Sequence, residues 1–139
     1  MSGKLNIGID LVEVSKVRKI FEKSKALQEE IFTQAEIRSS MCRRLPFVHL
    51  ATRFVIKEAL FKALKTGLSA GMDWHDVEVK EESAGKLALR LCGKTAEVAH
   101  SRGVVGQRIS WSHTRDYAVG MVLLIMNPPK RASAVQRSL

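Results

Sequence analysis

The segment RFVIKEALFKAL, residues 53–64, combines charged side chains with a composition typical of a buried helix. Successive residues of an α-helix are about 100° apart, so its apolar residues cover almost the whole circumference. Glu58 and Lys62 lie one turn from each other, whereas Lys57 projects from the other flank. Two interpretations remain open. The charges form an i,i+4 ion pair on a partly exposed helix, or a bound metal ion and a phosphate compensate for their burial.

A second carboxylate, Asp10, lies in the N-terminal segment KLNIGIDLVEV. The apolar residues Leu5, Ile7 and Ile9 alternate there with polar or small residues. This alternation predicts a strand with one buried apolar face and with Asp10 on the polar face, while Gly8 permits close approach of another backbone or a ligand. Mg²⁺ typically takes one or two protein carboxylates, a role that Asp10 and Glu58 suit. The alternative is that Asp10 caps the helix that follows it.

A third polar group, formed by Ser112, His113 and Thr114, ends a predicted strand at residues 107–113. All three side chains can donate hydrogen bonds to a phosphate group. The segment has neither the acidic partner nor the nucleophile elbow of a serine hydrolase, so we reject that enzyme class.

The pattern before the buried helix predicts shorter helices. From Glu13 onward the apolar period becomes helical, and the outer face of this helix is basic: Lys16, Arg18, Lys19 and Lys23. Thr33 and Glu36 have capping-box spacing and predict a second helix. Pro46 suits the first turn of the long helix, for which Gly67 is the expected C-terminal cap.

The pattern after the long helix predicts a small antiparallel sheet. Residues 73–82 and 86–92 alternate around a turn at Gly85 and predict a β-hairpin. A helix ending at Gly103 follows. The last predicted strand, residues 117–126, is apolar on both faces and is therefore expected at the centre of its sheet.

Composition indicates one soluble domain, residues 1–126, followed by a polar basic tail, residues 127–139, that we expect to be disordered. No apolar run reaches the roughly 18 residues that span a bilayer, and the N-terminus lacks signal-peptide features, so a cytoplasmic location is expected. Cys42 and Cys92 are expected to be reduced thiols. A net charge of +9 and a pI near 9.9 predict an anionic partner.

The ordered set of segments resembles the holo-acyl-carrier-protein synthases, the short-chain branch of the 4'-phosphopantetheinyl transferases. GID matches the family's G-x-D, and SHT precedes the last strand. FTQAEI and the hairpin WHDVEV and GKLALRL also resemble family segments. The resemblance covers about residues 5 to 125. The family block R-F-x-x-K-E-A-x-x-K-A-x-x-T-G here reads Arg53, Phe54, Lys57, Glu58, Ala59, Lys62, Ala63, Thr66 and Gly67.

The resemblance implies transfer of the phosphopantetheine arm of coenzyme A to a serine of apo-acyl carrier protein, a step of fatty acid biosynthesis. Adenosine 3',5'-bisphosphate is released, and Mg²⁺ is required. By position, Asp10 and Glu58 would hold the metal, and Lys62 would contact the phosphates as a third catalytic residue. The serine proton would pass either to Glu58 or to metal-bound water, and these alternatives stay open.

The same resemblance assigns the nucleotide end of coenzyme A to a second group of residues. These are Arg53, Ser112, His113 and Thr114, which would grip the 3'-phosphate in particular. Lys65 departs from the family, which often has Gly or another small residue at this position.

The resemblance also implies an α+β 4'-phosphopantetheinyl transferase fold, in which a small antiparallel sheet packs with a long central helix. It implies a homotrimer with active sites at subunit boundaries. The basic helix would steer an acidic acyl carrier protein, unless it is merely a solvated face. Two rival functions are a nucleic-acid-binding module, which the low aromatic content disfavours, and a catalytically inactive scaffold.

Overall fold

The structure, a computed structural model, describes residues 4–68 and 71–127. Within these ranges the elements are β1 (Lys4–Glu13), α1 (Val14–Lys23), α2 (Lys25–Ile31), α3 (Gln34–Met41), α4 (Pro46–Leu64), η1 (Trp74–Asp76), β2 (Val77–Glu81), η2 (Ser83–Gly85), β3 (Leu87–Leu91), α5 (Gly93–Ser101), β4 (Val104–His113) and β5 (Tyr117–Met126). Apart from Asn127, the tail for which we predicted disorder lies outside the described residues. The α+β class is confirmed, and no described helix has the length and apolarity needed to cross a membrane.

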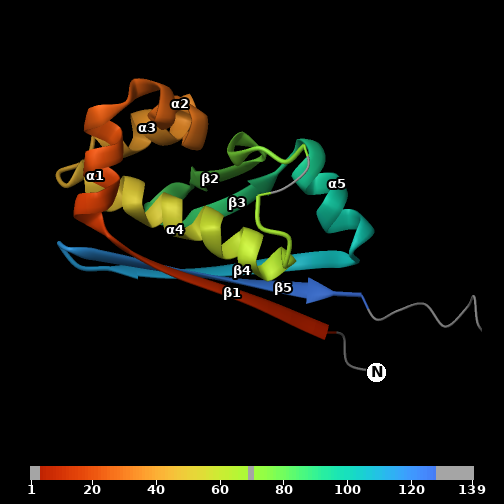
Figure 1. Ribbon diagram of the computed structural model, residues 1–139. Helices are drawn as coiled ribbons and strands as arrows, with labels where there is room; N and C mark the ends of the chain where they lie inside the picture. The colour runs from red at the N-terminus through yellow and green to blue at the C-terminus, as the bar shows by residue number, and fades with distance from the viewer. Residues whose placement is uncertain (1–3, 69–70, 128–139) are drawn as a thin grey trace, which may run out of the picture.

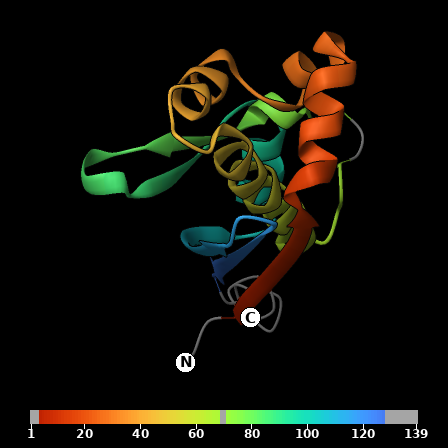
Figure 2. The ribbon, with the colours of Figure 1, turned by 90° about the vertical axis from the view of Figure 1, so that its left-hand side faces the viewer.

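The long helix α4 lies across a three-stranded antiparallel sheet of order β1-β5-β4 (Figure 1). A separate antiparallel hairpin, β2-β3, also contacts α4, as do α1 and α3. Figure 2 shows the sheet below α4 and the hairpin reaching out to one side. The prediction that β5 is central is confirmed, because β5 pairs with β1 on one side and β4 on the other.

Helix α4 is buried on almost every side, as its composition predicted. Its two ends contribute to two apolar clusters, one around Leu60 and Leu64 and the other around Leu50 and Val55. Gly8 of β1 lets the helix backbone come close. A Cβ at Gly8 would lie 2.7 Å from the backbone nitrogen of Ala63 and closer still to the carbonyl oxygen of Ala59. The close approach predicted at Gly8 is therefore made by α4.

The face of β1 that we expected to be buried is open in the single chain. Leu5, Ile7 and Ile9 are 57–58% exposed, so that part of the prediction is wrong. The polar and small face is the one that packs under α4, where Asn6 Nδ2 donates to the carbonyl oxygen of Ala63 at 3.2 Å. Gly8, on the same face, has no side chain and so lets β1 lie close to the backbone of α4.

One helix boundary and one whole helix also differ from prediction. Helix α4 ends at Leu64, and its C-cap is Lys65 in the left-handed region at φ 61°, not Gly67. Helix α2 was not predicted. It begins after Ser24, whose side chain accepts a hydrogen bond from the Leu27 backbone N–H at 3.1 Å. The capping box of Thr33 and Glu36 is confirmed at the start of α3.

Candidate active site

Strand β1 and helix α4 bring Asp10 and Lys62 together. Lys62 Nζ lies 2.9 Å from Asp10 Oδ1 and donates to the Ile9 carbonyl oxygen at 3.1 Å. The Lys62 side chain is 52% exposed and that of Asp10 is 18% exposed, so the pair lies at the surface. Asp10 does not cap the next helix, since the N-cap of α1 is Glu13. The ion pair of Lys62 is therefore formed across elements rather than along α4.

Glu58 is the second carboxylate of this group. Burial raises its pKa above the ordinary value, and the negative charge of Asp10 raises the pKa further, while the charge of Lys62 lowers it. Two carboxylates that repel each other in a partly desolvated setting favour a cation between them. Segments 48 residues apart in the sequence thus place Asp10 and Glu58 within each other's electrostatic influence.

These two carboxylates fit Mg²⁺ better than a transition metal. Within the described residues there is no cluster of three or more His, Cys, Asp and Glu side chains that would hold a metal. Mg²⁺ does not need such a cluster, because it keeps several waters and takes phosphate oxygens alongside one or two carboxylates. Asp10 and Glu58 supply that oxygen-only donor set.

Lys57 belongs to the interior rather than to this group. Its Nζ pairs with Glu36 Oε1 at 2.7 Å and donates to the carbonyl oxygens of Ile31 at 2.8 Å and Trp74 at 3.2 Å. Both charged side chains are fully buried. The Val79 backbone N–H donates to Glu36 Oε2 at 2.7 Å. Lys57 therefore ties α2, α3, η1 and β2 to α4.

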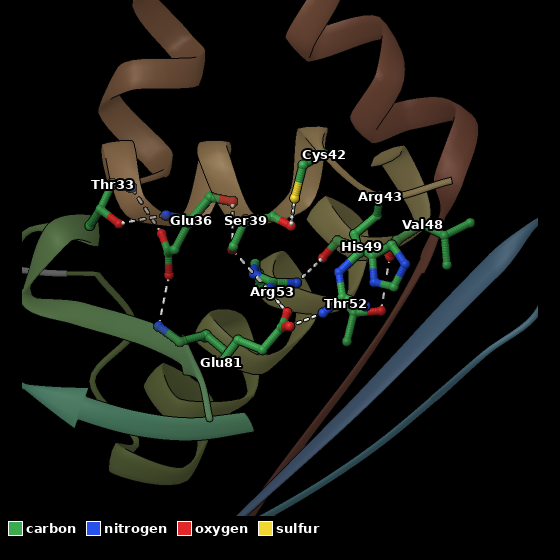
Figure 3. A network of polar contacts seen from close by, with 11 residues as sticks. Thr33, Glu36, Ser39, Cys42, Arg43, Val48, His49, Thr52, Arg53 and Glu81 are labelled. Carbon is green, nitrogen blue, oxygen red and sulfur yellow. Dashed lines mark hydrogen bonds and ion pairs between the residues drawn. The ribbon is translucent and has the colours of Figure 1, made fainter. Parts of the chain in front are cut away.

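A second polar site lies beside α4, in a cavity of about 130 Å³. Its polar side chains come from separate parts of the chain: Arg43, His49, Thr52, Arg53, Glu81 and His113. Figure 3 shows Arg43, His49, Arg53 and Glu81 gathered in one network. Burial lowers the pKa of His49, and the positive charges of Arg53, Arg43 and His113 lower it further. Among its described lining residues, Arg43 and Arg53 against Glu81 alone give this cationic cavity a net positive charge.

Arg53 has protein partners for most of its donors. Nη1 donates to the His49 carbonyl oxygen, while Nη2 donates to Ser39 Oγ and to Glu81 Oε1, each at 3.1 Å. The side chain is almost fully buried, and its Nε is without a partner among the described residues. Arg43 also pairs with Glu81 and is more exposed. Sequence reasoning missed Arg43, His49 and Glu81, although the double arginine RR before Pro46 was visible.

The SHT segment is divided by the alternation of strand β4. His113 lines the cationic cavity, and its ring centroid lies 5.9 Å from that of His49. Ser112 lies on the opposite face with Met121 and Ile9, because successive strand residues alternate. Thr114 Oγ1 accepts from the backbone N–H groups of Asp116 and Tyr117 at 3.2 and 3.0 Å. Of these three residues, only His113 lines the same cavity as Arg53 in the described structure.

Comparison with known proteins identifies the family. The ACPS model of the 4'-phosphopantetheinyl transferase superfamily matches residues 6–122. The chain belongs to this superfamily. It is similar to the holo-[acyl-carrier-protein] synthase of Desulforudis audaxviator (strain MP104C), with 41% identity over 87% of this chain and 92% of the relative. It is also similar to the synthase of Thermoanaerobacter sp. (strain X514), with 35% identity over 88% of each chain.

Solved structures of the superfamily share the fold. The "Chronobacterium ammoniagenes ACPS-CoA complex" matches with a TM-score of 0.80 and 28% identity, over 90% of this chain and 99% of that one. The holo-(acyl-carrier-protein) synthase of Bacillus anthracis str. Ames, in complex with CoA (3',5'-ADP), matches with a TM-score of 0.70 and 27% identity, over 88% and 96%. The predicted 4'-phosphopantetheinyl transferase fold is therefore confirmed.

This superfamily member also carries the predicted basic surface on α1. Lys16, Arg18, Lys19 and Lys23 are all exposed. The Arg18 guanidinium lies over the Phe47 ring at 4.9 Å. Arg18 also lines two neighbouring cavities of about 400 and 250 Å³, which add Arg115 and, in the smaller one, Arg44. Basic side chains thus extend from α1 to the start of α4 and the β4-β5 turn, although Glu13 and Asp116 also line the larger cavity.

Proposed function

We propose that this superfamily member transfers the 4'-phosphopantetheine group of coenzyme A to a serine of apo-acyl carrier protein, releasing adenosine 3',5'-bisphosphate. Family membership and the names of the relatives support this activity. The observation that carries it is the pairing of Lys62 with Asp10 at the junction of β1 and α4, with the Glu58 carboxyl within the electrostatic influence of both. The transfer belongs to fatty acid biosynthesis in the cytoplasm, where the exposed thiols of Cys42 and Cys92 remain reduced.

Asp10 and Glu58 would hold one Mg²⁺. When bound, the ion supplies positive charge that offsets the charge of the pyrophosphate. The serine oxygen of the carrier protein forms a bond to the β-phosphorus, and the bond from that phosphorus to the bridging oxygen breaks. Lys62, which is half exposed, donates to the phosphates and protonates the departing nucleotide. The acceptor of the serine proton stays open between Glu58 and water, because a carboxylate that binds a metal ion is a poor base.

The nucleotide end of coenzyme A fits the cationic cavity. His113 and Arg53 line this cavity, and Arg43 adds to its positive potential, whereas the lowered pKa of His49 favours a neutral imidazole there. We assign the 3'-phosphate to these residues, because guanidinium and imidazole donors recognise phosphate oxygens. Ser112 and Thr114 lie outside the cavity of the same subunit, so their role in coenzyme A binding requires the neighbouring subunit or a changed turn.

The acidic carrier protein fits the basic surface of α1. Like charges on Lys16, Arg18, Lys19 and Lys23 create a positive field at one end of the molecule. Such a field increases the rate of encounter with an anionic protein more than it increases the final affinity. The apolar lining beside Arg18, which includes Phe47 and Leu45, offers contact area next to these charges.

We propose that the enzyme is a homotrimer whose subunits meet at the open face of the sheet. Leu11 is 63% exposed on the same face of β1 as Ile7 and Ile9. These residues pair in register with Val119, Leu123 and Met121 of β5, so the apolar surface continues across two strands. Soluble monomers rarely leave such a continuous apolar surface uncovered. Ile7→Asp is expected to give monomers by analytical ultracentrifugation, whereas a wild-type monomer would contradict the proposal.

The activity is tested by incubating the protein with coenzyme A, Mg²⁺ and an apo-acyl carrier protein. Mass spectrometry of the carrier protein reports the added phosphopantetheine. We expect product with the wild type, and none in EDTA or with the folded variants Asp10→Ala and Glu58→Ala. A wild type that gives no product with any acidic carrier protein would refute the assignment. A variant with full activity would remove that carboxylate from the site.

A further inference from the structure

Glu81 bridges the two arginines of the cationic cavity. Its Oε1 accepts from Arg53 Nη2 at 3.1 Å, and its Oε2 pairs with Arg43 Nη2 (Figure 3). The side chain is 24% exposed and lies at the end of β2. One carboxylate thus uses each of its oxygens on a different guanidinium group. Two oxygens of a phosphate group make the same kind of contact.

The charges around Glu81 do not balance. Arg43, His49, Arg53 and His113 line the cavity from the α3-α4 segment, α4 and β4, and Glu81 is its only acidic lining residue in the described structure. Glu36 acts on Arg53 through its charge, but it is fully buried and paired with Lys57. Two guanidinium groups therefore face one carboxylate, and the buried Nε of Arg53 is without a partner. The cluster has capacity for an anion of higher charge than Glu81.

We propose that Glu81 is an internal counter-anion that competes with the 3'-phosphate of coenzyme A for Arg43 and Arg53. The proposal rests on the proposed function, which supplies the phosphorylated nucleotide. A carboxylate and a phosphate cannot both hold the two guanidinium groups at full strength, because their negative charges repel. Glu81 holds the arginines in place in the empty site and weakens retention of the phosphorylated ligand. It therefore favours release of adenosine 3',5'-bisphosphate after transfer.

Glu81→Gln tests the competition, because it keeps the shape of the side chain and removes its charge. Binding of coenzyme A and of 3'-dephospho-coenzyme A is measured by isothermal titration calorimetry at fixed ionic strength. We expect Glu81→Gln to bind coenzyme A about five- to tenfold more tightly, the size expected when one charged hydrogen-bonding competitor is removed. Binding of 3'-dephospho-coenzyme A should change less than about twofold.

Glu82→Gln is the matched control, since Glu82 is exposed, is the next residue along the chain and gives the same change in net charge. It should leave both affinities unchanged. Arg43→Gln provides a second test that does not depend on the Glu81 variant and should weaken coenzyme A selectively. Weaker coenzyme A binding by Glu81→Gln would overturn the proposal, because Glu81 would then serve to orient the arginines. Equal tightening for both ligands, or in Glu82→Gln, would reduce the effect to net charge and also overturn it.

The proposed function is judged separately by the transfer assay. If the wild type transfers phosphopantetheine but Glu81→Gln does not discriminate between the two ligands, only the role of Glu81 fails. If the wild type binds coenzyme A selectively and Glu81→Gln tightens it, but no carrier protein is modified, the transferase assignment fails and the competition stands.

Discussion

Lys57 and Lys62 occur in the same short segment, KEALFK, but the structure predicts opposite consequences of changing them. Lys57→Met removes the fully buried ammonium group that pairs with Glu36 at 2.7 Å. The carbonyl oxygens of Ile31 and Trp74 lose their donor, and Glu36 keeps a buried negative charge. Lys62→Met removes one member of a surface pair with Asp10.

Breaking a buried ion pair by removing one partner costs about 3–5 kcal/mol. Glu36 retains hydrogen bonds from the backbone N–H groups of Thr33 and Val79, so we expect the lower end, about 3 kcal/mol. For a domain of this size each kcal/mol lowers the melting temperature by roughly 3 °C, which gives a decrease of about 9 °C. The surface pair of Lys62 contributes at most about 1 kcal/mol.

The assay combines thermal unfolding by circular dichroism with the transfer of phosphopantetheine at a temperature where both variants are folded. Lys57→Met should melt about 9 °C lower and keep measurable activity, whereas Lys62→Met should melt within about 3 °C of the wild type and lose most activity. The reasoning is refuted if Lys57→Met melts like the wild type, or if Lys62→Met is the variant with the larger loss of stability.

Three further outcomes are expected. Lys65→Gly should raise the melting temperature by about 3 °C, because glycine removes roughly 1 kcal/mol of strain at φ 61°; a decrease in thermal melts would contradict this. In EDTA, the contribution of Glu58 to wild-type stability should fall as pH rises from 4.5 through its raised folded pKa, since the native state binds that proton more tightly. Glu58→Gln should flatten this slope in melts across the same pH range, and an unchanged slope would reject the shift. Raising the salt concentration should increase the KM for carrier protein more than the KM for coenzyme A, and equal effects would remove α1 from docking.

The elements that position the site were largely predictable, because their patterns are local. The apolar composition of α4 on all sides and of β5 on both faces predicted that these segments are buried. The capping box of Thr33 and Glu36 predicted where α3 begins. Helix α2 was not predicted because its seven residues are mainly polar and its N-cap, Ser24, is not part of a capping box. The left-handed C-cap at Lys65 was not predicted, because Gly67, two residues later, is the residue type that usually occupies this position.

The partners of individual charges were less predictable than the elements that carry them. Spacing on one helix suggested that Lys62 pairs with Glu58, but the position of β1 under α4 gives it Asp10 instead. Arg43, His49 and Glu81 line one cavity from three parts of the chain. A local sequence pattern does not predict which distant side chains lie together. The exposed apolar face of β1 has the same pattern as a buried strand face, because apolar alternation alone does not show what covers a face.

The central claim is that Asp10 and Glu58 together hold one divalent ion. The most direct test is electron paramagnetic resonance with Mn²⁺ in place of Mg²⁺, titrated into the protein in the presence of coenzyme A. The wild type is predicted to bind one ion per subunit, and the folded variants Asp10→Asn and Glu58→Gln to bind it at least about tenfold more weakly. Unchanged Mn²⁺ binding in both variants would contradict the account.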